Sequence, residues 1–144
     1  MTKKPEEEAR EKIDSLLDGA GWHVCDLKDA NIHAHRGVAI REFSLKPGHG
    51  SADYLFYLDG RAAGVIEAKK IGSTLTGVEI QSKKYTLGLP DPLPAWHRPL
   101  PFCYESTGIE TKFTNGLEPD PRSRNVVPSH FTWVAQFYCS PAFP

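Results

Sequence analysis

The stretch SADYLFYLDGRAAGVIEAKK, residues 51–70, decides the fold and raises the question of function. Two apolar runs flank an Asp-Gly pair, and this pair between alternating hydrophobic residues is the strongest short signal for a β-hairpin. One arm nevertheless carries Asp53, and the other carries Glu67 and Lys69. Because burying an unpaired charge is very costly, these groups are expected at a wet end of the sheet, either by accident or for a chemical role.

Composition limits the classes of protein to consider. The 144 residues are enough for one domain with a real core, and 40% hydrophobic and 24% charged residues are ordinary for a globular protein. No apolar run is long enough to cross a bilayer, and the N-terminus lacks the apolar core of a signal peptide, which predicts a cytoplasmic protein without a membrane contact. The net charge of −1 argues against a general polyanion-binding surface, although bases outnumber acids locally between residues 61 and 84.

Periodicity and turn signals predict a single α/β domain with a mixed central sheet. Pro5 and the acids after it begin a helix, and β-branched and aromatic runs indicate strands. Thr76 and Glu79 have the spacing of a capping box at the start of a second helix. The expected elements are a helix over 5–18, a strand over 38–45, hairpin strands over 53–58 and 62–70, a helix over 72–89, and strands over 102–107 and 110–115. Loops are expected over 90–101 and 117–125, and residues 23–37 are expected to form either a loop throughout or a loop with one short strand.

The charged hairpin residues act together only if they share a face. Glu67 and Lys69 are two residues apart on a strand and therefore point the same way. A strict two-residue turn would pair Asp53 with Ile66, leaving the two carboxylates on opposite faces. One additional residue in either arm corrects this, and Gly64 is a natural bulge position. We therefore predict a bulge between Asp53 and Glu67.

Two adjacent carboxylates and a lysine form a minimal set for metal-assisted phosphodiester hydrolysis. The repulsion between Asp53 and Glu67 raises the pKa of one of them unless a cation such as Mg²⁺ neutralises the pair. Lys69 then assists the attacking water or stabilises charge that develops on the phosphate. Gln81 and Tyr85 lie four residues apart on the second predicted helix, so they share a face and suit a phosphate site. The E-x-K pattern alone is common by chance, and Tyr85 alone is typical of a core aromatic.

A longer series of motifs carries a family resemblance. The segments REFSLKPGHGSADYLFYLDG, AGVIEAKK, QSKKY, LPAWHRPLPF and YESTGIETKFTN resemble the N-terminal domain of the restriction subunit of type I restriction-modification enzymes, over roughly residues 5–126. That family belongs to the PD-(D/E)xK nucleases, whose α-β-β-β-α-β core is the fold that the resemblance implies. By position, it implies catalytic Asp53, Glu67 and Lys69, phosphate-positioning Gln81 and Tyr85, and a metal site of Asp53, Glu67 and one acid of the first helix, for which Glu8 is chosen over Glu6 and Glu7.

The resemblance implies an Mg²⁺-dependent endonuclease that cleaves double-stranded DNA, with Mn²⁺ as a possible substitute. Its expected partners are the methyltransferase and specificity subunits of a type I complex. No GxxxxGK[ST] phosphate loop occurs in the chain, so we expect that this chain does not bind ATP. The alternatives are a catalytically silent DNA-binding or assembly module of the same fold, and a stand-alone dimeric nuclease or junction resolvase.

The resemblance ends near residue 126, which divides the chain into an expected nuclease domain, residues 1–126, and an atypical tail, residues 127–144. The tail is rich in aromatic residues. We expect it to pack as an extra strand or as an intermolecular contact.

Overall fold

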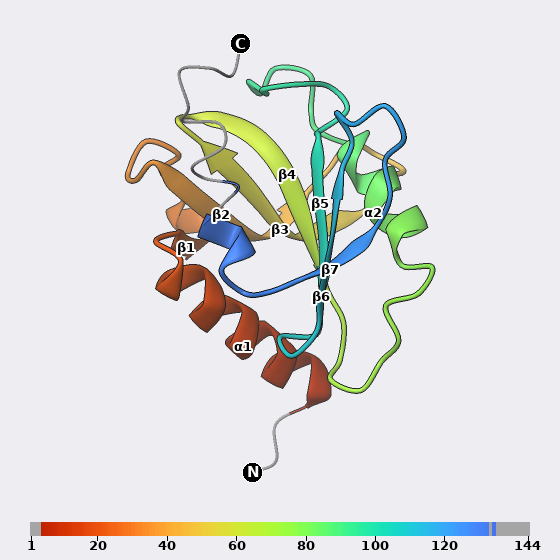
Figure 1. The fold of residues 1–144 in the computed structure, drawn as a ribbon. Coiled ribbons are helices and arrows are strands. Elements are labelled where there is room, and N and C mark those ends of the chain that lie inside the picture. The colour runs from red at the N-terminus through yellow and green to blue at the C-terminus, as the bar shows by residue number, and fades with distance from the viewer. Residues whose placement is uncertain (1–3, 133, 135–144) are drawn as a thin grey trace.

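A mixed β-sheet forms the centre of the protein (Figure 1). The structure is a computed structural model and describes residues 4–132 and 134. Among these residues, no helix has the length and apolar character needed to cross a membrane. The elements are α1 (Pro5–Gly19), β1 (His23–Asp26), the 3-10 helix η1 (Leu27–Asp29), β2 (Gly37–Ser44), β3 (Ser51–Leu58), β4 (Arg61–Ala68), α2 (Glu79–Thr86), β5 (Phe102–Ser106), β6 (Thr111–Asn115) and β7 (Arg124–Val126).

The strands of the described sheet lie side by side in chain order, from β1 to β7. β1 runs parallel to β2 and β4 runs parallel to β5, whereas the other neighbours are antiparallel. Parallel neighbours cannot be joined by a tight turn, and α2 lies in the crossover from β4 to β5. The α/β class with a mixed sheet is therefore confirmed, and the narrower assignment to the PD-(D/E)xK fold stays a prediction.

The two faces of the sheet bury separate apolar cores. Ile13 of α1 packs with Tyr54 on one face, whereas Tyr85 of α2 and the following Leu89 pack with Leu55 on the other. Successive side chains of a strand point to opposite faces, which is why neighbouring residues of β3 belong to different cores. Figure 1 shows α1 and α2 on opposite sides of the sheet. The edge of the sheet where β3 begins and β4 ends thus lies between the two helices.

The second helix is shorter than the sequence predicted. The predicted helix over 72–89 is reduced to α2, because Gly72 and Gly77 both take a positive φ, of 91° and 85°, that a continuous helix excludes. The N-cap is Val78, which makes no side-chain capping bond, rather than the predicted Thr76. The segment before α2 is therefore a loop that places the helix beside the end of β4.

The C-terminal segment contributes to the core within the described residues. The sequence predicted loop where β7 adds a strand at the sheet edge. Beyond it, residues 130–132 are helical, so this part of the tail is not the expected extra strand. Phe131 is buried in the core beneath α1, and Trp22 Nε1 donates to its carbonyl oxygen at 3.0 Å. The remainder of the predicted tail, residues 133 and 135–144, lies outside the described residues.

Candidate functional site

A β-bulge in the hairpin places the two carboxylates side by side. Tyr54 pairs with Ile66 in the β3–β4 ladder, and the register shifts further along because Ala63 has no partner on β3. The shift sets Asp53 opposite Glu67, as the proposed bulge requires. The bulge lies next to Gly64, where an added Cβ would overlap the backbone of β5 and an aromatic ring of β3. Close approach of these strands therefore explains the glycine.

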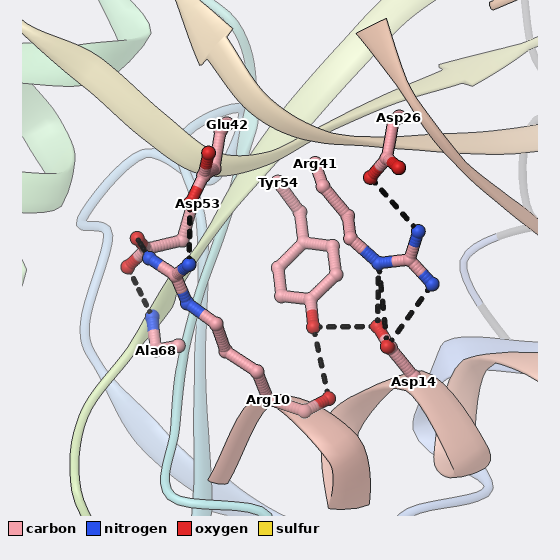
Figure 2. Close-up of polar contacts among 8 residues, drawn as sticks. All are labelled: Arg10, Asp14, Asp26, Arg41, Glu42, Asp53, Tyr54 and Ala68. Atoms are coloured by element: carbon pink, nitrogen blue, oxygen red, sulfur yellow. Dashed lines mark hydrogen bonds and ion pairs between the residues drawn. The ribbon is translucent and has the colours of Figure 1, made fainter. Parts of the chain in front are cut away.

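Asp53 is held by donors from two directions (Figure 2). Its Oδ2 accepts a hydrogen bond from the backbone N–H of Ala68 at 2.7 Å. Its Oδ1 accepts one from Arg10 Nη2 at 2.8 Å, and Arg10 Nη1 donates to Glu42 Oε1 at 2.6 Å. One arginine of α1 thus bridges an acid of β3 and an acid of β2.

Glu67 is a buried carboxyl group with only part of its hydrogen-bonding capacity used. The residue is 6% exposed, and its Oε1 lies 3.3 Å from Lys69 Nζ. Its Oε2 has no hydrogen-bond donor among the described residues. Burial, and after it the charge of Asp53, raises the pKa of Glu67 to about 7, although the lysine acts in the opposite sense. Burial and the neighbouring carboxylate therefore disfavour the charged form of Glu67.

A chain of polar contacts links the end of β4 to α2. Lys69 Nζ donates to Gln81 Oε1 at 3.2 Å, and Gln81 Nε2 donates to the hydroxyl oxygen of Tyr85 at 2.9 Å. The backbone N–H of Lys69 donates to the carbonyl of Ser106 at 2.9 Å, which fixes the chain as it leaves β4. Burial first and the charge of Glu67 second raise the pKa of Tyr85, so its hydroxyl stays protonated at neutral pH. These hydrogen bonds hold the polar groups of Lys69, Gln81 and Tyr85 beside the carboxylates.

The structure brings together Asp53, Glu67, Lys69, Gln81 and Tyr85 but does not bring Glu8 to them. Glu8 is exposed on α1 and lines a shallow hollow with Lys12 and Ser15. Residues two apart on a helix project from nearly opposite sides, so α1 turns Arg10 toward the sheet and Glu8 away from it. Within the described part of the chain, no group of three or more histidine, cysteine, aspartate or glutamate residues is arranged to hold a metal ion.

Three charged residues near the site were not predicted from the sequence. Arg10 follows the buried Ala9 on the apolar stripe of α1, and this position was the available signal that it faces the sheet. Glu42 lies opposite Asp53 on β2, between the ladder pairs on either side. Glu105 of β5 pairs with Glu67 in register and is fully buried. The last two depend on strand pairing, which the chain does not reveal by spacing alone.

A second polar network anchors α1 and so fixes the position of Arg10 (Figure 2). The Tyr54 hydroxyl donates to Asp14 Oδ1 at 2.7 Å and to the Arg10 carbonyl at 3.1 Å. Arg41 Nη2 forms an ion pair with Asp14 Oδ2 at 3.1 Å, and its Nη1 reaches Asp26 Oδ1 at the same distance. Burial, and after it the bond to Asp14, raises the pKa of Tyr54, which keeps this donor protonated. The helix is therefore tied to β1, β2 and β3.

No protein-family model, curated protein or solved structure matches the chain.

Proposed function

We propose that the protein is an Mg²⁺-dependent endonuclease domain that hydrolyses phosphodiester bonds of DNA. The observation that carries this proposal is the convergence of Asp53, Glu67 and Lys69 at one end of the sheet, beside Gln81 and Tyr85 of α2. The resemblance to the restriction subunit of type I enzymes supports the same function, because its motif residues are the ones that meet.

The carboxylates of Asp53 and Glu67 suit a hard divalent cation. The buried Glu67 Oε2 has no donor among the described residues, and the raised pKa of this group is what a nearby cation would reverse. Mg²⁺ binds through one or two carboxylates and keeps several waters, so a third protein acid is not required. When bound, the ion lowers the pKa of its water and polarises a phosphoryl oxygen. Mn²⁺ takes the same oxygen ligands and is expected to substitute.

The remaining side chains act on the phosphate. Lys69 places its ammonium group beside Glu67, where it stabilises negative charge that develops on the phosphate during hydrolysis. Gln81 orients Lys69 through its amide oxygen, and Tyr85 offers a protonated hydroxyl to a phosphate oxygen. Lys83 and Lys84 are exposed in the last turn of α2 and suit contacts to neighbouring phosphates, which position DNA without reading its sequence.

A second candidate is a DNA-binding or assembly module that keeps this arrangement without turnover. The observation that favours it is the ion pair between Arg10 and Asp53, which already neutralises one carboxylate by a side chain of the protein. In both readings, the resemblance supports association with the methyltransferase and specificity subunits of a type I complex. A stand-alone nuclease that cuts both strands would instead form a dimer, which light scattering would detect.

The test of the proposed function is nicking of supercoiled plasmid DNA by the full chain with Mg²⁺ or Mn²⁺. Asp53→Asn and Lys69→Gln change one catalytic group each with little change of shape, and Glu8→Gln is the matched control on α1. We expect nicking that requires the metal, disappears with EDTA and in both site variants, and is unchanged in the control.

The pattern of failure separates the candidates. Nicking by purified protein that persists in Asp53→Asn would refute the assigned site. Metal binding through Asp53 without nicking would favour a site that needs its partner subunits. The absence of both metal binding and nicking, with DNA binding retained, would favour the silent module.

A further inference from the structure

Arg10 occupies one of the two carboxylate oxygens of Asp53 that a metal ion would bind. Its Nη2 lies 2.8 Å from Asp53 Oδ1, while the other carboxylate oxygen accepts the backbone N–H of Ala68. Both oxygens of Asp53 are thus engaged by N–H donors, and Figure 2 shows the guanidinium between Asp53 and Glu42. A second cation at Oδ1 would lie within a few ångströms of this guanidinium, where like charges repel strongly.

Glu42 supplies Arg10 with a second anchor that does not depend on Asp53. Arg10 Nη1 donates to Glu42 Oε1 at 2.6 Å, through a different nitrogen from the one that contacts Asp53. Glu42 takes a positive φ of 51°, which is uncommon for a residue other than glycine, at the point of β2 opposite Asp53. Its side chain is 68% exposed, so it can follow a movement of the arginine into solvent.

We propose that Arg10 is an internal counter-cation of Asp53 that a divalent metal ion displaces, and that Glu42 retains the released guanidinium. This inference rests on the proposed function, because it assigns a regulatory residue to the same metal site. Without metal, Arg10 neutralises the charge of Asp53 and occupies its Oδ1. Metal binding then requires the loss of one ion pair, so the site is completed only when the ion is present.

The test is a titration of the full chain with Mn²⁺, without DNA, in which calorimetry measures the binding affinity. Arg10→Gln removes the competing charge, and we expect it to bind Mn²⁺ roughly tenfold more tightly than the wild type. Glu42→Gln removes the retaining anchor and leaves Arg10 committed to Asp53, so we expect binding roughly threefold weaker. Lys12→Gln makes the same change of net charge on another side of α1 and should leave the affinity unchanged.

The sign of the Arg10→Gln effect decides the inference. Equal or weaker Mn²⁺ binding by this variant, with normal binding by the wild type, would show that Arg10 organises the site and would overturn the proposal. If Arg10→Gln fails to fold, Arg10→Met also removes the positive charge and keeps the long stem of the side chain, and it should likewise bind Mn²⁺ more tightly than the wild type. Equal or weaker binding would again overturn the proposal. Wild-type binding that is insensitive to Asp53→Asn would instead refute the metal site of the proposed function.

Discussion

Replacing Glu67 with glutamine should stabilise the metal-free protein at pH 8. Glu67 is 6% exposed, carries an oxygen with no donor among the described residues, and lies beside Asp53. Glutamine keeps the shape and removes the charge that this position disfavours. We therefore expect the variant to lose metal binding and gain stability, which is the trade-off typical of functional sites.

The magnitude follows from the pKa. The difference between the ordinary glutamate value of 4.5 and about 7 for Glu67 corresponds to at most about 3 kcal/mol of stability lost by the wild type at high pH. That figure already includes the favourable contact between Lys69 and Glu67, because the lysine acts on the same pKa. A gain of up to about 3 kcal/mol in the free energy of unfolding is therefore expected at pH 8.

The pH dependence of the free energy of unfolding tests this prediction. Because the folded-state pKa is raised, the stability that protonation of Glu67 gives the wild type is fully present below pH 4.5 and is lost as the pH rises to about 7. Urea denaturation at pH 4 and pH 8, without metal, should therefore show no gain at pH 4 and a gain at pH 8 for Glu67→Gln. The exposed Glu8→Gln is the control for loss of one carboxylate. A variant less stable than the wild type at pH 8 would contradict this reasoning.

Three further perturbations test other parts of the structure. Gly64→Ala should lower the free energy of unfolding by about 2–4 kcal/mol in a urea titration, because the added methyl group overlaps the backbone of β5. Gly19→Ala is the control, and it should be nearly neutral because the space around Gly19 is open. Phe131→Ala should cost about 3–5 kcal/mol in thermal denaturation since the ring is buried, and the exposed Val127→Ala should cost little; similar values for the two would show that the C-terminal segment is not part of the core. Burial, and after it the charge of Arg124, lowers the pKa of His130, so the wild type should lose stability as the pH falls below 6.5. A His130→Asn variant should lose less stability over the same pH range, and an equal loss would refute this assignment.

The sequence was most informative where local rules and packing agree. Asp59 and Gly60 both take positive φ values in a two-residue turn, as the Asp-Gly signal predicts. The bulge was also predictable, because only one extra residue could place Asp53 and Glu67 on one face. These features depend on contacts between residues close in the chain, for which spacing determines geometry.

Features that depend on distant contacts were not predictable. The length of α2 is limited by glycines whose positive φ suits the crossover to β5, a tertiary requirement that overrides the apolar spacing. The pairing of Arg10 with Asp53 joins residues 43 positions apart. The exposed Glu8 matched the expected composition of a metal site, but helix rotation turns it away, and that rotation is set by the contacts of Tyr54 with α1.

The burial of Phe131 beneath α1 sets an order of events during synthesis on the ribosome. Trp22 and Phe131 are 109 positions apart, so the indole gains its carbonyl acceptor only after nearly all of the described chain has emerged. The β3–β4 hairpin needs only neighbouring residues and forms early, since local contacts form fastest. The nascent chain therefore carries its acid pair before the apolar layer behind it is sealed. Translation that stops before residue 131 would release a chain whose open layer favours aggregation and proteolysis.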